Sequence, residues 1–392
     1  MGPLAQSVEQ RTFNPWVVGS IPTGPTKCNT IKSASLIKLL MDLRRILSKF
    51  KFLQKLKSDV LRKTTYFSMP PYNIQWIRSF KFADKFLQAN PITLVDIGSR
   101  DGGCEELISL RKYINYIGFD ADANSTNSDK ELNLRLGYKS FRLYPKFIGS
   151  HEGTIRFKLY KRRSESSNLS PGKIYQKYFS KSLKVEEIID VSSIILEKFM
   201  SKIKTQPDII KLDTQGTEFQ IINSSKTLFT KTLIVEVEVE FVEMYQNQKL
   251  YFDVCKILDQ LGFQILYINR VFGNMNNGFI SSRGQLLFGD ALFGMTLERA
   301  FKLSLAGKAK YCLLLINYGH MDFAYEVYKS EPMLNDLIPE MKVIFENSLR
   351  NSLTNKITRV LRMKLDRVAF NYLRIRKTNG LLFDSDRSYP IR

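Results

Sequence analysis

Acidic side chains stand at the ends of three short apolar segments of this sequence. Asp96 precedes the glycine that ends ITLVDIG, Asp120 ends NYIGFD, and Asp213 ends PDIIKLD. Short apolar runs rich in β-branched residues and bounded by turn residues are typical of buried strands. In an open α/β sheet, ligands bind beyond the carboxyl ends of the strands. The sequence therefore predicts a ligand site with carboxylates at the edge of such a sheet.

The first of these segments continues into a glycine-rich turn, DIGSRDGG. A dinucleotide site needs the spacing G-x-G-x-x-G, with backbone N–H groups facing a pyrophosphate. This turn has a different glycine spacing, and Asp96 would repel a phosphate. A cationic ligand suits it better, and S-adenosylmethionine carries an ammonium and a sulfonium but no phosphate. The residues interpreted as the cofactor loop are Asp96, Gly98, Arg100, Asp101 and Gly102.

The second strand offers an acid for the nucleoside part of such a cofactor. Asp120 lies 24 residues after Asp96, and an acid at this strand end can accept both ribose hydroxyls. Asp122 competes for the same role. The alternative is that both acids only solvate a loop, and two acids at adjacent strand ends favour binding over that alternative.

The segment PDIIKLDTQGTEFQII supplies the candidate catalytic residues. Lys211 and Asp213 share one strand parity, so their side chains are expected on the same side of the sheet. Asp213 is the candidate base or metal ligand, and Lys211 is expected to tune it. Glu218 falls in the first turn of the next helix, where the helix dipole favours an acid. A catalytic role and a simple helix-start role for Glu218 have equal weight.

The segment LIVEVEVEF alternates three glutamates with valines. Acids on one face of a strand usually mark a solvated face. In a central strand that arrangement would be costly, so Glu238 and Glu240 are candidate substrate or metal contacts. The four cysteines form no CxxC pair, and the two histidines are far apart in sequence. We therefore predict no structural zinc site and no disulfide framework, we assign no metal, and a reducing cytoplasm fits best.

Strand and helix patterns alternate from residue 92 to about 294, which predicts a mainly parallel α/β sheet covered on both faces. A helix is expected over 104–113, directly after the cofactor loop. Residues 297–330 predict a helical hairpin with a turn at Gly319. The expected organisation is a non-native or disordered extension over 1–40 with the true start near Met41, a basic helical segment over 41–90, the main domain over 91–296, and a basic helical region over 297–392.

The net charge of +21 is concentrated at the two ends of the chain. Residues 1–90 hold 15 Lys and Arg against 4 Asp and Glu, and residues 341–392 hold 12 against 4. We interpret these ends as solvated basic helices, with weak attraction to an anionic membrane surface as the sharper alternative. No run of 18 apolar residues is present, so no transmembrane helix is predicted. The expected location is the cytoplasm, at most peripheral to the inner membrane face, with no specific nucleic-acid partner. The oligomeric state is left open.

Five segments together resemble the FkbM-type methyltransferase family, across residues 92–294. They are VDIGSRDGG, YIGFDAD, IIKLDTQGTEFQII, VEVEVEF and GDALF. The resemblance implies a class I, Rossmann-like fold with a seven-stranded sheet, S-adenosylmethionine as cofactor, and O-methylation of sugar hydroxyls in glycans or natural products. It maps Asp96, Gly98 and Gly102 to cofactor-loop positions and Asp120 to the ribose acid.

Two positions depart from that family pattern. Many relatives carry Asn and a different residue where Arg100 and Asp101 stand, and Glu-Gly where Gln215-Gly216 stands. The sequence therefore predicts an S-adenosylmethionine-dependent methyltransferase acting on a small-molecule or glycan acceptor. The alternatives are an NAD-dependent sugar-modifying enzyme on a similar fold and a non-catalytic, basic RNA-binding or scaffold protein.

Overall fold

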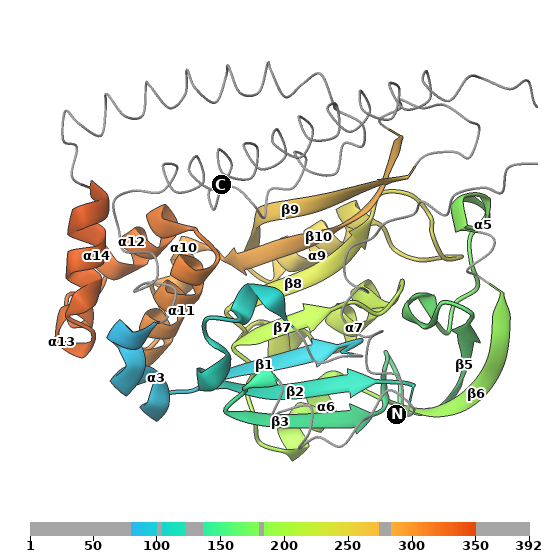
Figure 1. Ribbon diagram of the computed structural model, residues 1–392, viewed down its shortest axis with the longest axis horizontal. Coiled ribbons are helices and arrows are strands. Elements are labelled where there is room, and N and C mark those ends of the chain that lie inside the picture. Colours follow the sequence, from blue (N-terminus) through green and yellow to red (C-terminus); the bar gives the residue numbers. More distant parts are fainter. Residues whose placement is uncertain (1–79, 100–103, 123–135, 180–183, 274–283, 350–392) are drawn as a thin grey trace, which may run out of the picture. The chain divides into compact units, whose positions relative to one another are not determined.

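A seven-stranded sheet forms the centre of the computed structural model (Figure 1), which describes residues 80–99, 104–122, 136–179, 184–273 and 284–349. The strand order is β3-β2-β1-β7-β8-β10-β9. The first five run parallel, whereas β10 runs antiparallel to both β8 and β9. The strands are β1 (Ile92–Ile97), β2 (Ile114–Asp120), β3 (Ser140–Pro145), β7 (Ile209–Leu212), β8 (Ile234–Glu240), β9 (Phe263–Gly273) and β10 (Gln285–Met295). The predicted mainly parallel seven-stranded sheet is confirmed.

Strand β1 lies where the order of the strands reverses. It pairs with β2 on one side and with β7 on the other, and all six of its residues are buried. In the sheet, β2 and β3 lie on one side of β1, and β7 and β8 lie on the other. This switch point is where open α/β sheets bind their ligands, so the fold itself places the site at the carboxyl end of β1.

A second, three-stranded sheet with the order β4-β6-β5 was not distinguished in the sequence. It consists of β4 (Phe147–Ile148), β5 (Gly153–Tyr160) and β6 (Val185–Ile194), with the 3-10 turn η5 (Arg163–Glu165) and helix α5 (Lys173–Phe179) between β5 and β6. Figure 1 shows this sheet on the side toward which β1, β2 and β7 point. Alternation of residue types identifies a strand but does not show which sheet the strand joins. The sequence therefore did not reveal that these strands form a separate sheet.

The helices α6, α7, α8 and α9 contact one another and the β8–β9 part of the large sheet. Their bounds are α6 (Leu196–Lys202), α7 (Glu218–Ser224), α8 (Lys226–Phe229) and α9 (Tyr251–Gln260). The helix expected over 104–113 is wrong. That segment forms only two 3-10 turns, η2 (Glu105–Leu107) and η3 (Arg111–Tyr113). Leu107 and Leu110 are both buried at a spacing of three residues, which a 3-10 turn satisfies without a full helix.

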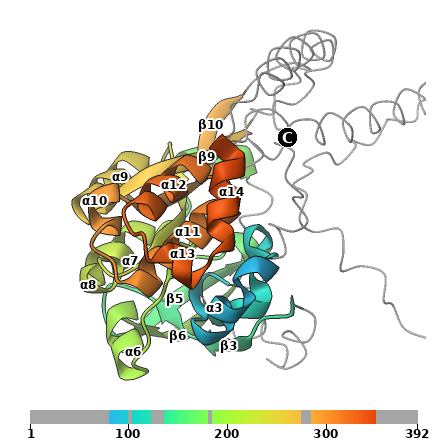
Figure 2. The same ribbon diagram turned by 90° about the vertical axis from the view of Figure 1, so that its left-hand side faces the viewer.

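The C-terminal helices share one hydrophobic core with the sheet. The helices are α10 (Leu297–Ala300), α11 (Leu305–Asn317), α12 (Met321–Lys329), α13 (Leu334–Leu337) and α14 (Glu340–Leu349). The predicted hairpin of α11 and α12 is confirmed, and Gly319 between them has a left-handed φ of 87°. Figure 2 shows α11 to α14 grouped together, with η1 (Lys81–Ala83) and α3 (Asp84–Ala89) beside them.

Several predictions fall outside the described residues: the extension over 1–40, the basic helix after Met41 and the basic residues after 349. Across the described ranges, no helix is both long and apolar enough to cross a membrane. Cys104, Cys255 and Cys312 are free thiols.

Candidate active site

The turn after β1 brings the ends of β1, β2 and β7 together. Gly98 has a φ of 84°, and its N–H donates to the Phe119 carbonyl of β2 at 2.9 Å. A Cβ atom at Gly98 would lie 1.9 Å from the Asp213 carbonyl oxygen. Only glycine permits this approach, because any side chain would overlap the backbone of the neighbouring strand end. Arg100, Asp101 and Gly102 lie outside the described residues.

Asp96 lies inside the sheet, where protein groups already offset its charge. Its side chain is 1% exposed. Tyr116 Oη donates to Asp96 Oδ2 at 2.7 Å, and Lys211 Nζ lies 4.0 Å from Asp96 Oδ1. Asp96 pairs in register with Lys211, and Lys211 with Glu236, so the three side chains share one face of the sheet. We refer to Asp96, Lys211 and Glu236 as the charged row.

Lys211 is held as a cation by this row. The Asp96 carboxylate raises the pKa of Lys211 well above its usual value, against the opposing effect of burial, and the carboxylates of Asp213 and Glu236 add to the shift. A lysine with a raised pKa stays protonated at neutral pH, so Lys211 cannot serve as a base. Among the described residues, Lys211 forms an ion pair with Asp96, so its predicted influence on Asp213 acts through charge at longer range.

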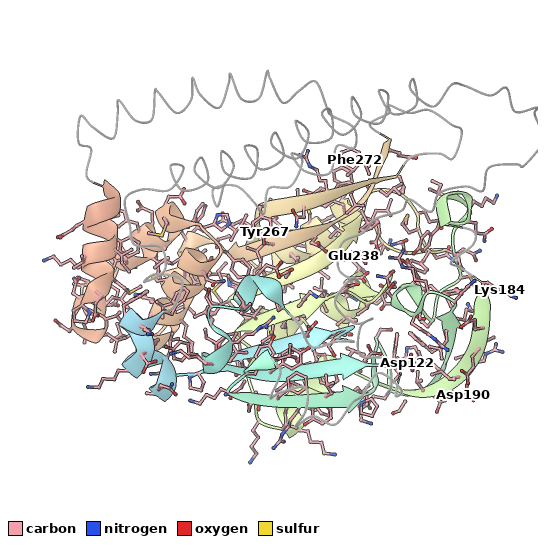
Figure 3. All side chains as sticks on the ribbon, viewed as in Figure 1. Asp122, Lys184, Asp190, Glu238, Tyr267 and Phe272 are labelled. Carbon is pink, nitrogen blue, oxygen red and sulfur yellow. The ribbon has the colours of Figure 1, made fainter. Side chains whose placement is uncertain are left out.

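Asp120 ends β2 and shapes the turn that follows. Its Oδ1 atom accepts a hydrogen bond from the Asp122 N–H at 2.8 Å. Both residues are half-buried. In Figure 3, Asp122 lies beyond the end of β2 on the side of the second sheet, which carries Asp190. The strand-end position belongs to Asp120, and its role toward a ribose stays a prediction.

Asp213 follows β7 directly beside the turn after β1, since its N–H donates to the Ile97 carbonyl at 3.0 Å. Its side chain belongs to a set of hydrogen bonds that the sequence did not reveal. Gln215 Nε2 donates to Asp213 Oδ1 at 2.9 Å and to Glu238 Oε2 at 2.8 Å. Tyr245 Oη donates to Gln215 Oε1 at 2.8 Å. Gln215 thus links two predicted site residues, Asp213 and Glu238. The sequence analysis had identified Gln215 only as a position that differs from the family pattern.

Glu218 is the first residue of α7 and is 2% exposed. Its Oε1 atom accepts hydrogen bonds from Thr214 N and Thr214 Oγ1, both at 2.8 Å, and from Gly216 N at 3.2 Å. Burial raises the pKa of Glu218, and these hydrogen bonds act in the opposite direction. Such contacts stabilise the loop after β7. They favour the structural interpretation of Glu218, while its catalytic role stays a prediction.

Glu238 and Glu240 lie in a central strand, so the solvated-face interpretation of this segment is wrong. Glu240 is 3% exposed, and Glu238 is partly buried and pairs in register with Asp290 of β10. Burial raises the pKa of both glutamates well above the usual value, and the nearby negative charges of Asp213 and Glu218 raise it further. One oxygen each of Glu218, Glu238 and Glu240 lie within 4.8 Å of one another. Three acids at this spacing do not by themselves establish a metal site.

The second sheet contributes a carboxyl group that the sequence analysis missed. Glu165 ends the turn η5 and is 9% exposed. Burial raises the pKa of Glu165 to about 7. The charge of Arg162, whose Nη1 atom lies 3.6 Å from Glu165 Oε1, opposes this shift, and the charge of Asp213 adds to it. Tyr245 Oη also lies 2.9 Å from the Glu165 carbonyl oxygen. In the sequence Glu165 stands in a Ser-rich loop, and no local pattern connects it to Asp213.

The site as a whole fits a ligand that carries cationic groups and a ribose. Strand-end carboxylates surround a turn whose backbone closes against β2 and β7, and no G-x-G-x-x-G turn follows β1. A mostly parallel seven-stranded sheet of this strand order, with β10 antiparallel between β8 and β9, is the fold of class I, Rossmann-like methyltransferases.

Comparison with known proteins finds one family model that matches part of the chain. Residues 96–265 match the family model described as the methyltransferase FkbM domain. The chain therefore contains an FkbM-type domain and is a methyltransferase that uses S-adenosylmethionine. No curated protein matches the chain.

Solved structures of methyltransferases resemble the chain only distantly. Precorrin-6y C5,15-methyltransferase from Geobacter metallireducens is 6% identical over 52% of this chain and 80% of its own, with a TM-score of 0.29. Magnesium protoporphyrin IX methyltransferase from Synechocystis, with bound SAM, is 11% identical over 57% and 82%, with a TM-score of 0.26. 1,6-Didemethyltoxoflavin-N1-methyltransferase from Burkholderia thailandensis is 10% identical over 69% and 94%, with a TM-score of 0.27. Similarity this low does not bear on the acceptor.

Proposed function

We propose that this methyltransferase O-methylates a hydroxyl group of a sugar, glycan or related natural product, and that Asp213 accepts the hydroxyl proton. The observation that carries the proposal is the contact between Asp213 and the cofactor turn. The Asp213 N–H donates to Ile97, and the Asp213 carbonyl closes against Gly98. A carboxylate fixed at this place lies beside the position where the fold binds its cofactor.

A hydroxyl acceptor needs such a carboxylate. When bound, S-adenosylmethionine supplies an electrophilic methyl group on its sulfonium. A sugar hydroxyl is a poor nucleophile at neutral pH, so a positioned base must take its proton as it attacks. Gln215 occupies Asp213 Oδ1, which fixes the orientation of the carboxylate and leaves Oδ2 to accept that proton. The chain's own task is then to align the hydroxyl with the methyl carbon and to exclude water.

Two features of the chain bear on the other proposed functions. The FkbM match and the absence of G-x-G-x-x-G after β1 favour the methyl donor over NAD. The basic ends over 1–79 and 350–392, on which nucleic-acid or membrane binding would depend, lie outside the described residues. A cytoplasmic location, weak attraction to anionic membranes and no specific nucleic-acid partner remain proposals.

Labelled S-adenosylmethionine, incubated with the full-length chain and separate glycan, lipid and RNA fractions, tests the function. We expect label in the glycan fraction, and label only in RNA would refute the proposal. Asp213→Asn should lower turnover about 10²–10⁴-fold, as expected for loss of a general base. Calorimetry should show unchanged affinity of this variant for S-adenosylmethionine. Asp259→Asn, at an exposed position of α9, is the matched control and should retain wild-type turnover.

A further inference from the structure

The side chain of Gln215 lies between two carboxylates, and the proposed reaction assigns it no role. Its amide nitrogen donates to Asp213 Oδ1 and to Glu238 Oε2, so acids from the ends of two neighbouring strands share one donor group. We propose that Gln215 is a positioning residue that holds Asp213 and Glu238 as a fixed pair, and that the second sheet sets its position. The catalytic consequence rests on the function proposed above, whereas the effect on the two carboxylates does not.

The orientation of the Gln215 amide follows from the chemistry of its neighbours. The NH₂ group faces Asp213 and Glu238, and an ionised carboxylate only accepts hydrogen bonds. The opposite orientation would place the amide oxygen against two carboxylate oxygens. Tyr245 Oη then donates to Gln215 Oε1 at 2.8 Å, which uses the remaining side of the amide. Every polar atom of this side chain therefore has a partner of the right kind.

The backbone of Gln215 is held in a conformation that few non-glycine residues adopt. Its φ is 57°, in the left-handed region. Ser167, which is fully buried, donates from Oγ to the Gln215 carbonyl at 2.8 Å. The Ser167 backbone is paired with Lys158 of β5. An uncommon backbone conformation persists where its surroundings determine it, and here those surroundings belong to the second sheet.

The residue after Gln215 also fits closely against this unit. A Cβ atom at Gly216 would lie 3.0 Å from Leu169 Cδ1 and 3.2 Å from Tyr245 Cδ2. Gly216 itself has a φ of 104°. The Gln-Gly pair is thus enclosed by the loop of the second sheet and by Tyr245, so the amide cannot turn away from the carboxylates without breaking these contacts.

The shared amide changes the charge balance of the pair. Two carboxylates at one place compete for ionisation, and one of them takes a raised pKa. Hydrogen bonds donated to the charged forms favour ionisation of both. Gln215 is such a donor to both carboxylates, whereas burial and nearby acids raise the pKa of Glu238. A glutamate at position 215 would reverse this effect, because a third carboxylate would replace the donor.

Gln215→Glu tests the proposal, because it retains the size of the side chain and removes both N–H donors. The first readout is infrared titration of protonated carboxyl groups in the full chain without any acceptor. We expect one carboxyl titration to move upward by about 1–3 pH units, the size of shift that a neighbouring charge produces. Gln176→Glu, at an exposed glutamine of α5 whose amide donates only to the Pro171 carbonyl among the described residues, is the matched control. An infrared titration equal to that of the control would overturn the proposal.

The second readout is the pH profile of methyl transfer to the acceptor fraction. Gln215→Glu should move the acidic limb upward by about one to two pH units, so that turnover at a pH on the acidic side of that limb falls about 10–100-fold. Affinity for S-adenosylmethionine should stay within about twofold of the wild type, less than 0.5 kcal/mol. The double variant Gln215→Glu with Glu238→Gln restores one amide and one carboxylate at these two positions, and it should regain part of the lost turnover.

The outcomes separate this inference from the proposed function. If the infrared titration shifts but Asp213→Asn retains full turnover, the base assignment fails and the positioning of the carboxylates stands. If the pH profile is unchanged while Asp213→Asn is inactive, the positioning role fails and the base stands. Should Gln215→Glu not fold, Tyr245→Phe releases one side of the amide. It should then shift the same carboxyl titration in the same direction by a smaller amount, and the absence of a shift would again overturn the proposal.

Discussion

The large sheet holds its charges in two different ways. In the charged row at mid-sheet, the cation of Lys211 lies between the acids Asp96 and Glu236 in register. At the carboxyl edge two residues further along, Asp213 and Glu238 are separated by the neutral amide of Gln215. In the row, opposite charges offset one another. At the edge, one amide donor holds two acidic groups close together.

This difference indicates that the charged row has a structural role, whereas the carboxyl edge is suited to proton transfer. An ion pair inside a sheet fixes the protonation state of its members, so the charged row suits a structural role near neutral pH. An acid held by a neutral donor retains its capacity to accept a proton. The raised pKa values of Glu165 and Glu238 belong to the edge and its surroundings. We therefore expect changes in the row to act mainly on stability and changes at the edge to act mainly on pH dependence.

Breaking the row should have the largest effect on stability. Lys211→Met removes the cation and leaves Asp96, which is 1% exposed, in the sheet without it. Removing one partner of a buried ion pair costs about 3–5 kcal/mol, and the 23% exposure of the Lys211 side chain places this case at about 3–4 kcal/mol. Urea unfolding followed by circular dichroism measures the free energy of unfolding.

Lys342→Met is the matched control for that experiment. Lys342 pairs with Glu346 at 3.9 Å on α14, and both side chains are more than half exposed. Exposed pairs of this spacing contribute about 0.3–0.5 kcal/mol. If the two variants lost similar amounts of stability, the charged row would have no special structural role.

The sequence predicted the sheet and its edge well because both depend on local patterns. The apolar runs that became β1, β2, β7 and β8 are visible without any knowledge of their neighbours. Strand-end acids are equally visible, and Asp120 and Asp213 lie at the strand ends, whereas Asp96 lies within β1 and is buried against Tyr116 and Lys211. These parts of the fold are determined by residues close together in the chain.

The remaining parts depend on contacts between distant segments. Gln215 lies 48 residues from Ser167 and 30 from Tyr245 in the chain, and no period or motif connects these positions. The pairing of Lys211 with Asp96 likewise follows from strand register, which the sequence did not supply. Glu165 came from a sheet that the sequence did not separate from the first. Long-range pairing is thus the physical reason why the hydrogen-bond partners of the site were missed.

A smaller effect, with a distinct pH dependence, is expected at the edge. The pKa of Glu165 is raised from 4.5 to about 7, so the folded state binds its proton more tightly than the unfolded state. Its contribution to stability is therefore complete below pH 4.5 and is lost as the pH rises to about 7. Glu165→Gln stays neutral and should match the wild type near pH 4.5 but exceed it by about 2–3 kcal/mol at pH 8.

Urea unfolding of both proteins from pH 4 to pH 8 checks this prediction. The difference between the two free energies of unfolding should grow between pH 4.5 and 7 and then level off. A difference that stays constant over the whole range would show that Glu165 titrates normally.

The smallest predicted effect asks whether Asp96 supports the fold or the cofactor. Tyr116→Phe removes the hydrogen bond to Asp96 Oδ2 but keeps the ring, which stacks on Phe141 at 4.6 Å. Losing a hydrogen bond to a charged group costs about 1.5 kcal/mol. Tyr138→Phe is the control, because within the described ranges the Tyr138 hydroxyl accepts one long hydrogen bond, of 3.4 Å from Cys104 N. Calorimetry with S-adenosylmethionine then decides the question. Lower stability of Tyr116→Phe with unchanged cofactor affinity assigns Asp96 a structural role. Weaker cofactor affinity with unchanged stability would instead assign Asp96 to cofactor binding.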